Sequence, residues 1–313
     1  MTPLRRPLPA QERAFVQSVV YAALFDYPLT PEQLCEALIG EIADEPTLMC
    51  WYNSSPYLQA LVEYADGFFF PRGRGELLRT RADREATSRT LLQELAGPLK
   101  LVTRMPFVRL VALSGSLAHL NADRDADLDL FVVTSPRRVW TVTVATLLIA
   151  RVLGWRKRLC LNYVVSERTL WIAPADLFSA NQIVHLQPIL GTDAYRKFLE
   201  ANRFVERFYP NFVPRPVAED RRPSIVEGVI NATIGGVLEQ ACRVVYRAHL
   251  RRQAHRWKSR DQVRLDSECL KLHTSSHRHE VMERFEGALE AATAALDDAT
   301  VRYGESSPWP ATL

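Results

Sequence analysis

The chain has 313 residues, of which 47% are hydrophobic and 24% charged, and its formal net charge is +3. This length and composition predict two or three folded domains and argue against a disordered or fibrous protein. Because the net charge is small, the molecule as a whole is not a polycation, and any nucleic-acid binding would depend on a local patch.

Cysteine spacing and apolar runs exclude several further classes. The five cysteines are scattered, with no close Cys-x-x-Cys pair, which argues against a disulfide framework or a zinc module. Residues 1–10 are rich in Pro and Arg and lack the apolar segment of a signal peptide. The longest apolar run, 139–153, is interrupted by three threonines and Arg151, so it is too short and too polar to cross a bilayer. We therefore expect a cytoplasmic protein without a membrane partner.

Residues 1–80 predict a winged-helix-like domain. Two helices are expected over 11–40, and Thr30 caps the second, with Pro31 at its first position. A third helix is expected over 58–64, and a strand pair follows around the Asp66-Gly67 turn.

The second of these helices has the wrong charge for a DNA groove. It contains Glu32 and Glu36 and no Lys or Arg, whereas a recognition helix should be positive. DNA binding by this domain stays open, and a role as a structural or protein-contact module is favoured.

Residues 81–209 predict the core, which makes the expected fold class α/β (α+β) with a small mixed sheet. A polar, Arg-rich helix over 81–104 precedes an alternating β-branched pattern. Strands are expected at 107–113, 128–133 and 159–165, with an apolar helix over 137–153 between the last two. Residues 210–313 begin with a Pro-rich connector, and we expect them to form a C-terminal helical domain that closes over the site.

One stretch of the core has the pattern of a phosphate and metal site. A strand ends at Gly115-Ser116, ten residues intervene, and Asp127-Leu128-Asp129 begins the next strand. Glycine lets a backbone approach a phosphate closely, and the serine hydroxyl and neighbouring N–H groups can donate to its oxygens. Carboxylates two apart on a strand point to the same face and suit a hard cation such as Mg²⁺.

This arrangement resembles the nucleotidyltransferase superfamily that includes DNA polymerase beta, with the spacing of its minimal and aminoglycoside-modifying branches. The resemblance covers about residues 107–165. It implies that Asp127 and Asp129 bind Mg²⁺ (or Mn²⁺), and that Gly115 and Ser116 hold the triphosphate of an NTP such as ATP. The alternative is a solvated acidic loop. Against it, the two aspartates alternate with apolar residues, and their charges would repel in a partly buried strand unless a cation lay between them.

One position departs from the pattern of the family. Members usually have a third carboxylate on a later strand, and the corresponding position here is Asn162. An amide oxygen can ligate a cation but is no general base near neutral pH. Either the acceptor is already ionised, or a base comes from elsewhere (Glu167, Asp176 or His185), or the site binds nucleotide without efficient turnover.

Two further clusters are candidates for binding. Eight Lys and Arg residues lie within 243–264, and Arg243 and Arg247 belong to a stripe that recurs every four residues on one helical face. The stripe suits triphosphate, an anionic acceptor or RNA backbone, or it is a solvated face paired with acids. His273, His277 and His279 are compatible with a metal, but a His-rich loop or helix cap is favoured.

Together these features predict an Mg²⁺-dependent transferase that moves an NMP from an NTP to a hydroxyl or phosphate acceptor, with release of pyrophosphate. The acceptor is a small molecule or, less favoured, RNA or protein. Two alternatives stay open: a catalytically weak nucleotide- or DNA-binding regulator, and a toxin-like nucleotidyltransferase that modifies tRNA or protein.

Overall fold

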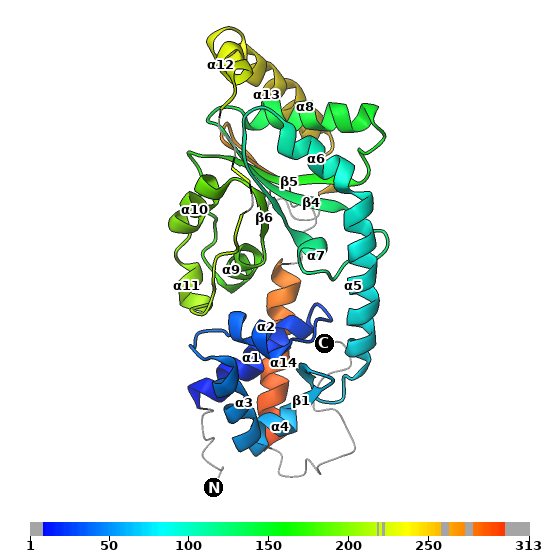
Figure 1. Cartoon of the computed structure of the whole chain (residues 1–313), viewed down its shortest axis with the longest axis vertical. Coiled ribbons are helices and arrows are strands. Elements are labelled where there is room, and N and C mark those ends of the chain that lie inside the picture. Colours follow the sequence, from blue (N-terminus) through cyan, green and yellow to red (C-terminus); the bar gives the residue numbers. More distant parts are fainter. Residues whose placement is uncertain (1–8, 218, 221–222, 258–262, 273–277, 298–313) are drawn as a thin grey trace.

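The computed structural model describes residues 9–217, 219–220, 223–257, 263–272 and 278–297. Its fold is mixed α/β: a six-stranded sheet lies at the centre, helices cover both of its faces, and a small helical unit with a hairpin lies at one end (Figure 1). Within these residues, no helix is long and apolar enough to span a bilayer.

The N-terminal unit contains the helices and the hairpin that the sequence predicts. Its elements are α1 (Ala10–Ala23), α2 (Pro31–Glu36), α3 (Glu45–Ser54), α4 (Pro56–Leu61), β1 (Val62–Ala65) and β2 (Phe68–Pro71). Thr30 caps α2 as expected: its hydroxyl accepts from Gln33 N at 3.2 Å, and the Gln33 side chain accepts from Thr30 N. Asp66 and Gly67 have φ of 51° and 83°, the positive values that a tight hairpin turn needs.

Two details of this unit differ from the sequence prediction. Helix α3 was not expected, and the helix expected over 58–64 ends at Leu61, where β1 begins. Helix α2 is turned toward the rest of the chain, because Glu36 forms an ion pair with Arg215 at 2.9 Å and Asn211 Nδ2 donates to Cys35 O at 3.0 Å.

The central sheet has the strand order β6-β3-β4-β5-β8-β7. Strands β3 (Val108–Leu113), β4 (Leu128–Thr134) and β5 (Leu159–Ser166) lie where the alternating apolar patterns predict them. The parallel pair β4 and β5 is connected by α8 (Val139–Val152), and the other pairs are antiparallel. Strand β6 (Gln187–Leu190) was not expected, and its Pro188 is tolerated because β6 lies at the edge of the sheet.

Side chains that alternate along the strands build one core on each face of the sheet. On one face, Val111, Val132 and Val164 pack with α6 (Ala96–Arg104), α8 and α13 (Gly235–Arg252). On the other, Val133 and Val165 pack with α9 (Leu177–Val184), α10 (Thr192–Ala201) and α11 (Val205–Phe208). Figure 1 shows these two groups of helices on opposite sides of the strands.

Buried glutamates attach the helices α12 (Ile225–Ala232) and α13 to the core. Glu227 accepts from Phe107 N at 2.9 Å and pairs with Arg109 Nη2 at 2.5 Å. Glu239 accepts from the N–H groups of Trp140 and Thr141 at 3.0 and 2.8 Å, and so satisfies the start of α8, which has no side-chain cap of its own.

The described part of residues 210–313 does not form the separate helical domain that the sequence suggested. After α13 and the short helix η1 (Ala254–Arg256), strands β7 (Val263–Leu265) and β8 (Cys269–Leu272) extend the central sheet through β5. Helix α14 (Arg278–Asp297) then packs on α1, where the Tyr21 and Phe285 rings meet edge to face at 5.1 Å (Figure 1). Strands of three and four residues give too short a pattern to be separated from helix by periodicity.

Candidate functional site

Gly115 and Asp129 lie next to each other at one end of the strands, where β3 ends and β4 begins. Gly115 follows β3 and begins the short helix α7 (Gly115–Ala118), with φ of +65°. A Cβ atom at this position would lie 2.6 Å from Asp129 Oδ2, so only glycine leaves room for the carboxylate in its present place. Ser114 N donates to Asp129 O at 3.0 Å and joins the turn to β4.

The other acidic residues of this stretch are exposed. Asp127 directly precedes β4, and Leu128 between the two aspartates is fully buried in the core on the α8 side. Asp129 therefore points away from α8, toward the face that α9 covers. Asp123, in the loop that precedes β4, pairs with Arg84 of α5 (Glu76–Glu94) at 3.3 Å.

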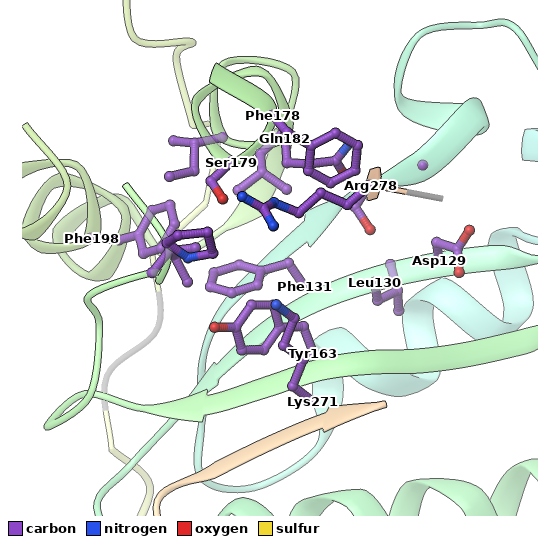
Figure 2. Close-up of a pocket in the computed structure, with 16 residues that line it drawn as sticks. Asp129, Leu130, Phe131, Tyr163, Phe178, Ser179, Gln182, Phe198, Lys271 and Arg278 are labelled. Atoms are coloured by element: carbon purple, nitrogen blue, oxygen red, sulfur yellow. The ribbon is translucent and has the colours of Figure 1, made fainter. Parts of the chain in front are cut away.

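Asp129 lines a cavity of about 160 Å³ between the sheet and α9, here named the first cavity. Figure 2 shows Asp129 toward one end of this cavity and Phe198 toward the other. Rings of Phe131, Phe178 and Phe198 give it apolar walls, and Gly115 reaches it from the turn after β3. The first cavity therefore has the Asp129 carboxylate and the Gly115 backbone in its wall beside apolar rings.

Two cationic side chains that the sequence prediction missed also line the first cavity. Lys271 of β8 is only 8% exposed, and its Nζ lies 5.4 Å from the centroid of the Tyr163 ring. Burial lowers the pKa of Lys271. Arg278, at the start of α14, extends between α9 and the strands (Figure 2).

Arg278 is held by the N-terminal end of α9. Its Nε donates to Asp176 Oδ2 at 3.0 Å, and Asp176 Oδ1 caps α9 by accepting from Ser179 N at 2.9 Å. Burial alone would raise the pKa of Asp176, but the hydrogen bonds from Ser179 and Arg278 keep this pKa below its usual value. Asp176, one of the proposed general bases, is therefore occupied with Arg278.

The strand that contains Asn162 bulges beside Asp129. Asp129 pairs with Cys160 and Phe131 with Tyr163, so Leu161 and Asn162 both lie opposite Leu130. Because of the extra residue, side chains along β5 do not alternate strictly between the two faces of the sheet. Leu161 and Val164 are three positions apart, yet both belong to the core on the α8 side. The side-chain role expected of Asn162 lies outside what the structure describes.

A neighbouring cavity is lined by Gly115, Ser116 and His185. Glu167 is not among the residues that line this cavity. Glu167 lies at the far end of β5 and lines a separate cavity with Arg109 and Glu227. Of the three proposed bases, His185 is therefore the one that shares a cavity with the Gly-Ser turn while making no ion pair among the described contacts.

The structure does not bring Arg243 and Arg247 to Asp129. Both residues lie on α13, which packs on α8, and the first cavity lies on the opposite face of the sheet. In the histidine cluster, His273 and His277 lie outside the described residues, and His279 Nε2 lies 3.1 Å from Glu283. No group of three or more His, Cys, Asp or Glu side chains with metal-binding geometry occurs in the described segments.

Comparison of the chain with protein-family models, with curated proteins and with solved structures finds no match.

Proposed function

We propose that the chain is an Mg²⁺-dependent (or Mn²⁺-dependent) nucleotidyltransferase, which moves an NMP from an NTP to a hydroxyl or phosphate acceptor and releases pyrophosphate. The observation on which this proposal depends is the contact between Gly115 and the Asp129 carboxylate at the wall of the first cavity. A turn that follows one strand and a carboxylate on the next strand can thereby act on the same phosphate group.

The donor set suits a hard cation. Asp129 faces the cavity, and Asp127 is exposed just before the same strand, so an extended backbone would direct both carboxylates to one side. Mg²⁺ usually takes one or two protein carboxylates and completes its six oxygen ligands with water and substrate phosphate. When bound, the ion would neutralise charge on the departing pyrophosphate.

The cationic residues of the first cavity give the site a second means of holding phosphate. Lys271 and Arg278 reach the cavity from β8 and α14. The charge of Lys271 complements a triphosphate, whereas Arg278, which is paired with Asp176, contributes less charge. Phe131 and Tyr163 are in edge-to-face contact, with ring centroids 5.5 Å apart, and offer an apolar wall for a nucleobase. In this proposal Lys271 and Arg278 take the place that the sequence suggested for Arg243 and Arg247.

A regulator that binds nucleotide without turnover is the principal alternative. The bulge at Asn162 lies where the resembled family has its third carboxylate, and losing a general base typically costs about 10²–10⁴ in rate. A regulator that reads DNA through α2 has less support, because that helix is acidic and pairs with Arg215. A toxin-like transferase acting on tRNA or protein differs from the main proposal only in its acceptor.

Nucleotide binding and turnover can be tested separately. We expect a fluorescent ATP analogue to bind the wild-type chain in Mg²⁺ and not in EDTA, and Asp129→Asn to weaken this binding. Asp125→Asn removes the same charge from an exposed loop residue and should leave binding unchanged. Pyrophosphate release from each NTP, measured with candidate acceptors, then separates the enzyme from the regulator. Mg²⁺-independent binding, or equal effects of the two variants, would refute the proposed site.

A further inference from the structure

A second cavity, of about 180 Å³, lies between the N-terminal unit and the core. Helix α1 supplies Tyr21 and Ala22 to its wall, and the turn after β3 supplies Gly115 and Ser116. Gly115 and Gln182 line this cavity and the first one, so the two cavities adjoin at the Gly-Ser turn. A ligand in the second cavity would therefore lie next to the group held by Gly115.

The walls of the second cavity favour an uncharged ligand with an apolar body. The rings of Tyr21, Phe25, Tyr27 and Tyr209 surround it together with aliphatic side chains. Its polar lining consists of hydroxyl, amide and imidazole groups, and no Asp, Glu, Lys or Arg is among the described residues that line it. A charged ligand would lose its hydration here without gaining an opposite charge.

Two groups at this cavity match the two hydrogen bonds that a hydroxyl makes. Tyr21 is 3% exposed, and its Oη has no hydrogen-bond partner within the described part of the chain. His185 Nδ1 lies 2.8 Å from the carbonyl O of Asn181, so Nδ1 bears the proton and Nε2 keeps a lone pair. A hydroxyl could thus accept from Tyr21 and donate to His185.

We propose that the second cavity is the acceptor site, and that it takes a small neutral molecule with a hydroxyl on an aromatic or aliphatic body. This inference depends on the proposed nucleotidyltransferase function. The hydroxyl oxygen attacks the α-phosphorus, the bond from that phosphorus to the bridging oxygen breaks, and pyrophosphate leaves with the electron pair. The hydroxyl proton passes to His185 Nε2.

His185 is neutral at pH 7, because burial lowers its pKa to about 4. Its Nε2 lone pair can therefore accept the hydrogen bond of the hydroxyl, and as a weak base it takes the proton only as the new oxygen–phosphorus bond forms. His119, whose ring centroid lies 4.1 Å from that of His185, also has a lowered pKa because of burial and the nearby His185. Neutral His185, with His119 beside it, is therefore the candidate proton acceptor. Asp176 is paired with Arg278, and Glu167 lines a separate cavity.

The test measures binding of para-fluorobenzyl alcohol to the full chain by fluorine NMR, with para-fluorotoluene as the matched probe without a hydroxyl. We expect the alcohol to bind more tightly. Ala22→Leu fills the cavity and should weaken both probes about tenfold. Tyr21→Phe keeps the shape and should weaken only the alcohol, about fivefold, the effect of one hydrogen bond. Ala86→Leu, the same change at an exposed position of α5, should alter neither.

Binding of the fluorescent ATP analogue in Mg²⁺ is measured on the same samples and separates the two proposals. If ATP binds but the alcohol does not, or if Ala22→Leu leaves the alcohol unaffected, the acceptor site is refuted and the nucleotidyltransferase proposal stands. If the alcohol binds and ATP does not, both the acceptor role and the proposed function are refuted.

Discussion

Replacing Gly115 by alanine should separate the role of this glycine at the site from its role in the backbone. The added Cβ would lie 2.6 Å from Asp129 Oδ2, and an ordinary contact begins near 3.4 Å, so the carboxylate oxygen must move by about 0.8 Å. The positive φ of +65° adds a strain of about 1–2 kcal/mol for a non-glycine residue. We expect a modest loss of stability together with a large loss of Mg²⁺-dependent nucleotide binding.

The size of each effect can be set against a matched variant. Gly154 has φ of +77° and no atom within 4 Å of an added Cβ, so Gly154→Ala has the backbone strain without the contact. Urea denaturation should show a similar loss for both variants, about 1–2 kcal/mol. Titration with the ATP analogue should show a loss of about 10- to 100-fold for Gly115→Ala alone. Equal nucleotide affinity of the two variants would refute the role assigned to the contact with Asp129.

Three further predictions concern charged and titratable groups. Lys271→Met should keep the fold and weaken ATP binding about tenfold, and an unchanged affinity in the same titration would remove Lys271 from the site. Arg109→Met should lower the free energy of unfolding by about 3–5 kcal/mol, measured in urea, because Glu227 is 1% exposed and would keep its charge without the Arg109 pair. His185 has a folded pKa near 4, below the unfolded value, so the unfolded chain binds more protons between pH 4 and 6.5. Stability should therefore rise with pH over that window, and this rise in the urea midpoint should be smaller in His185→Gln.

Local signals explain the parts of the fold that the sequence predicted well. The Thr30 cap, the Asp66-Gly67 turn and the alternating strands β3 and β4 each depend on residues a few positions apart. The proximity of Gly115 to Asp129 could also be predicted from the local sequence, because a short connection between two neighbouring strands allows few arrangements of the turn.

Long-range packing explains what the sequence prediction missed. Lys271 and Arg278 reach the first cavity only because β8 pairs with β5 and α14 returns to α1, and neither contact has a local signature. Arg243 and Arg247 lie on one side of a helix, but this spacing does not predict on which face of the sheet the helix packs. On α13, Tyr246 and Leu250 turn toward the core on the α8 side.

The return of α14 to α1 has a consequence for the order in which the protein is made. Tyr21 of α1 emerges from the ribosome well before its ring partner Phe285, which belongs to the last helix of the described chain. The N-terminal unit therefore cannot acquire its full apolar cover until the chain has been synthesised through α14. Such late closure exposes α1 during translation, and chaperones that bind apolar helices would have their longest opportunity there.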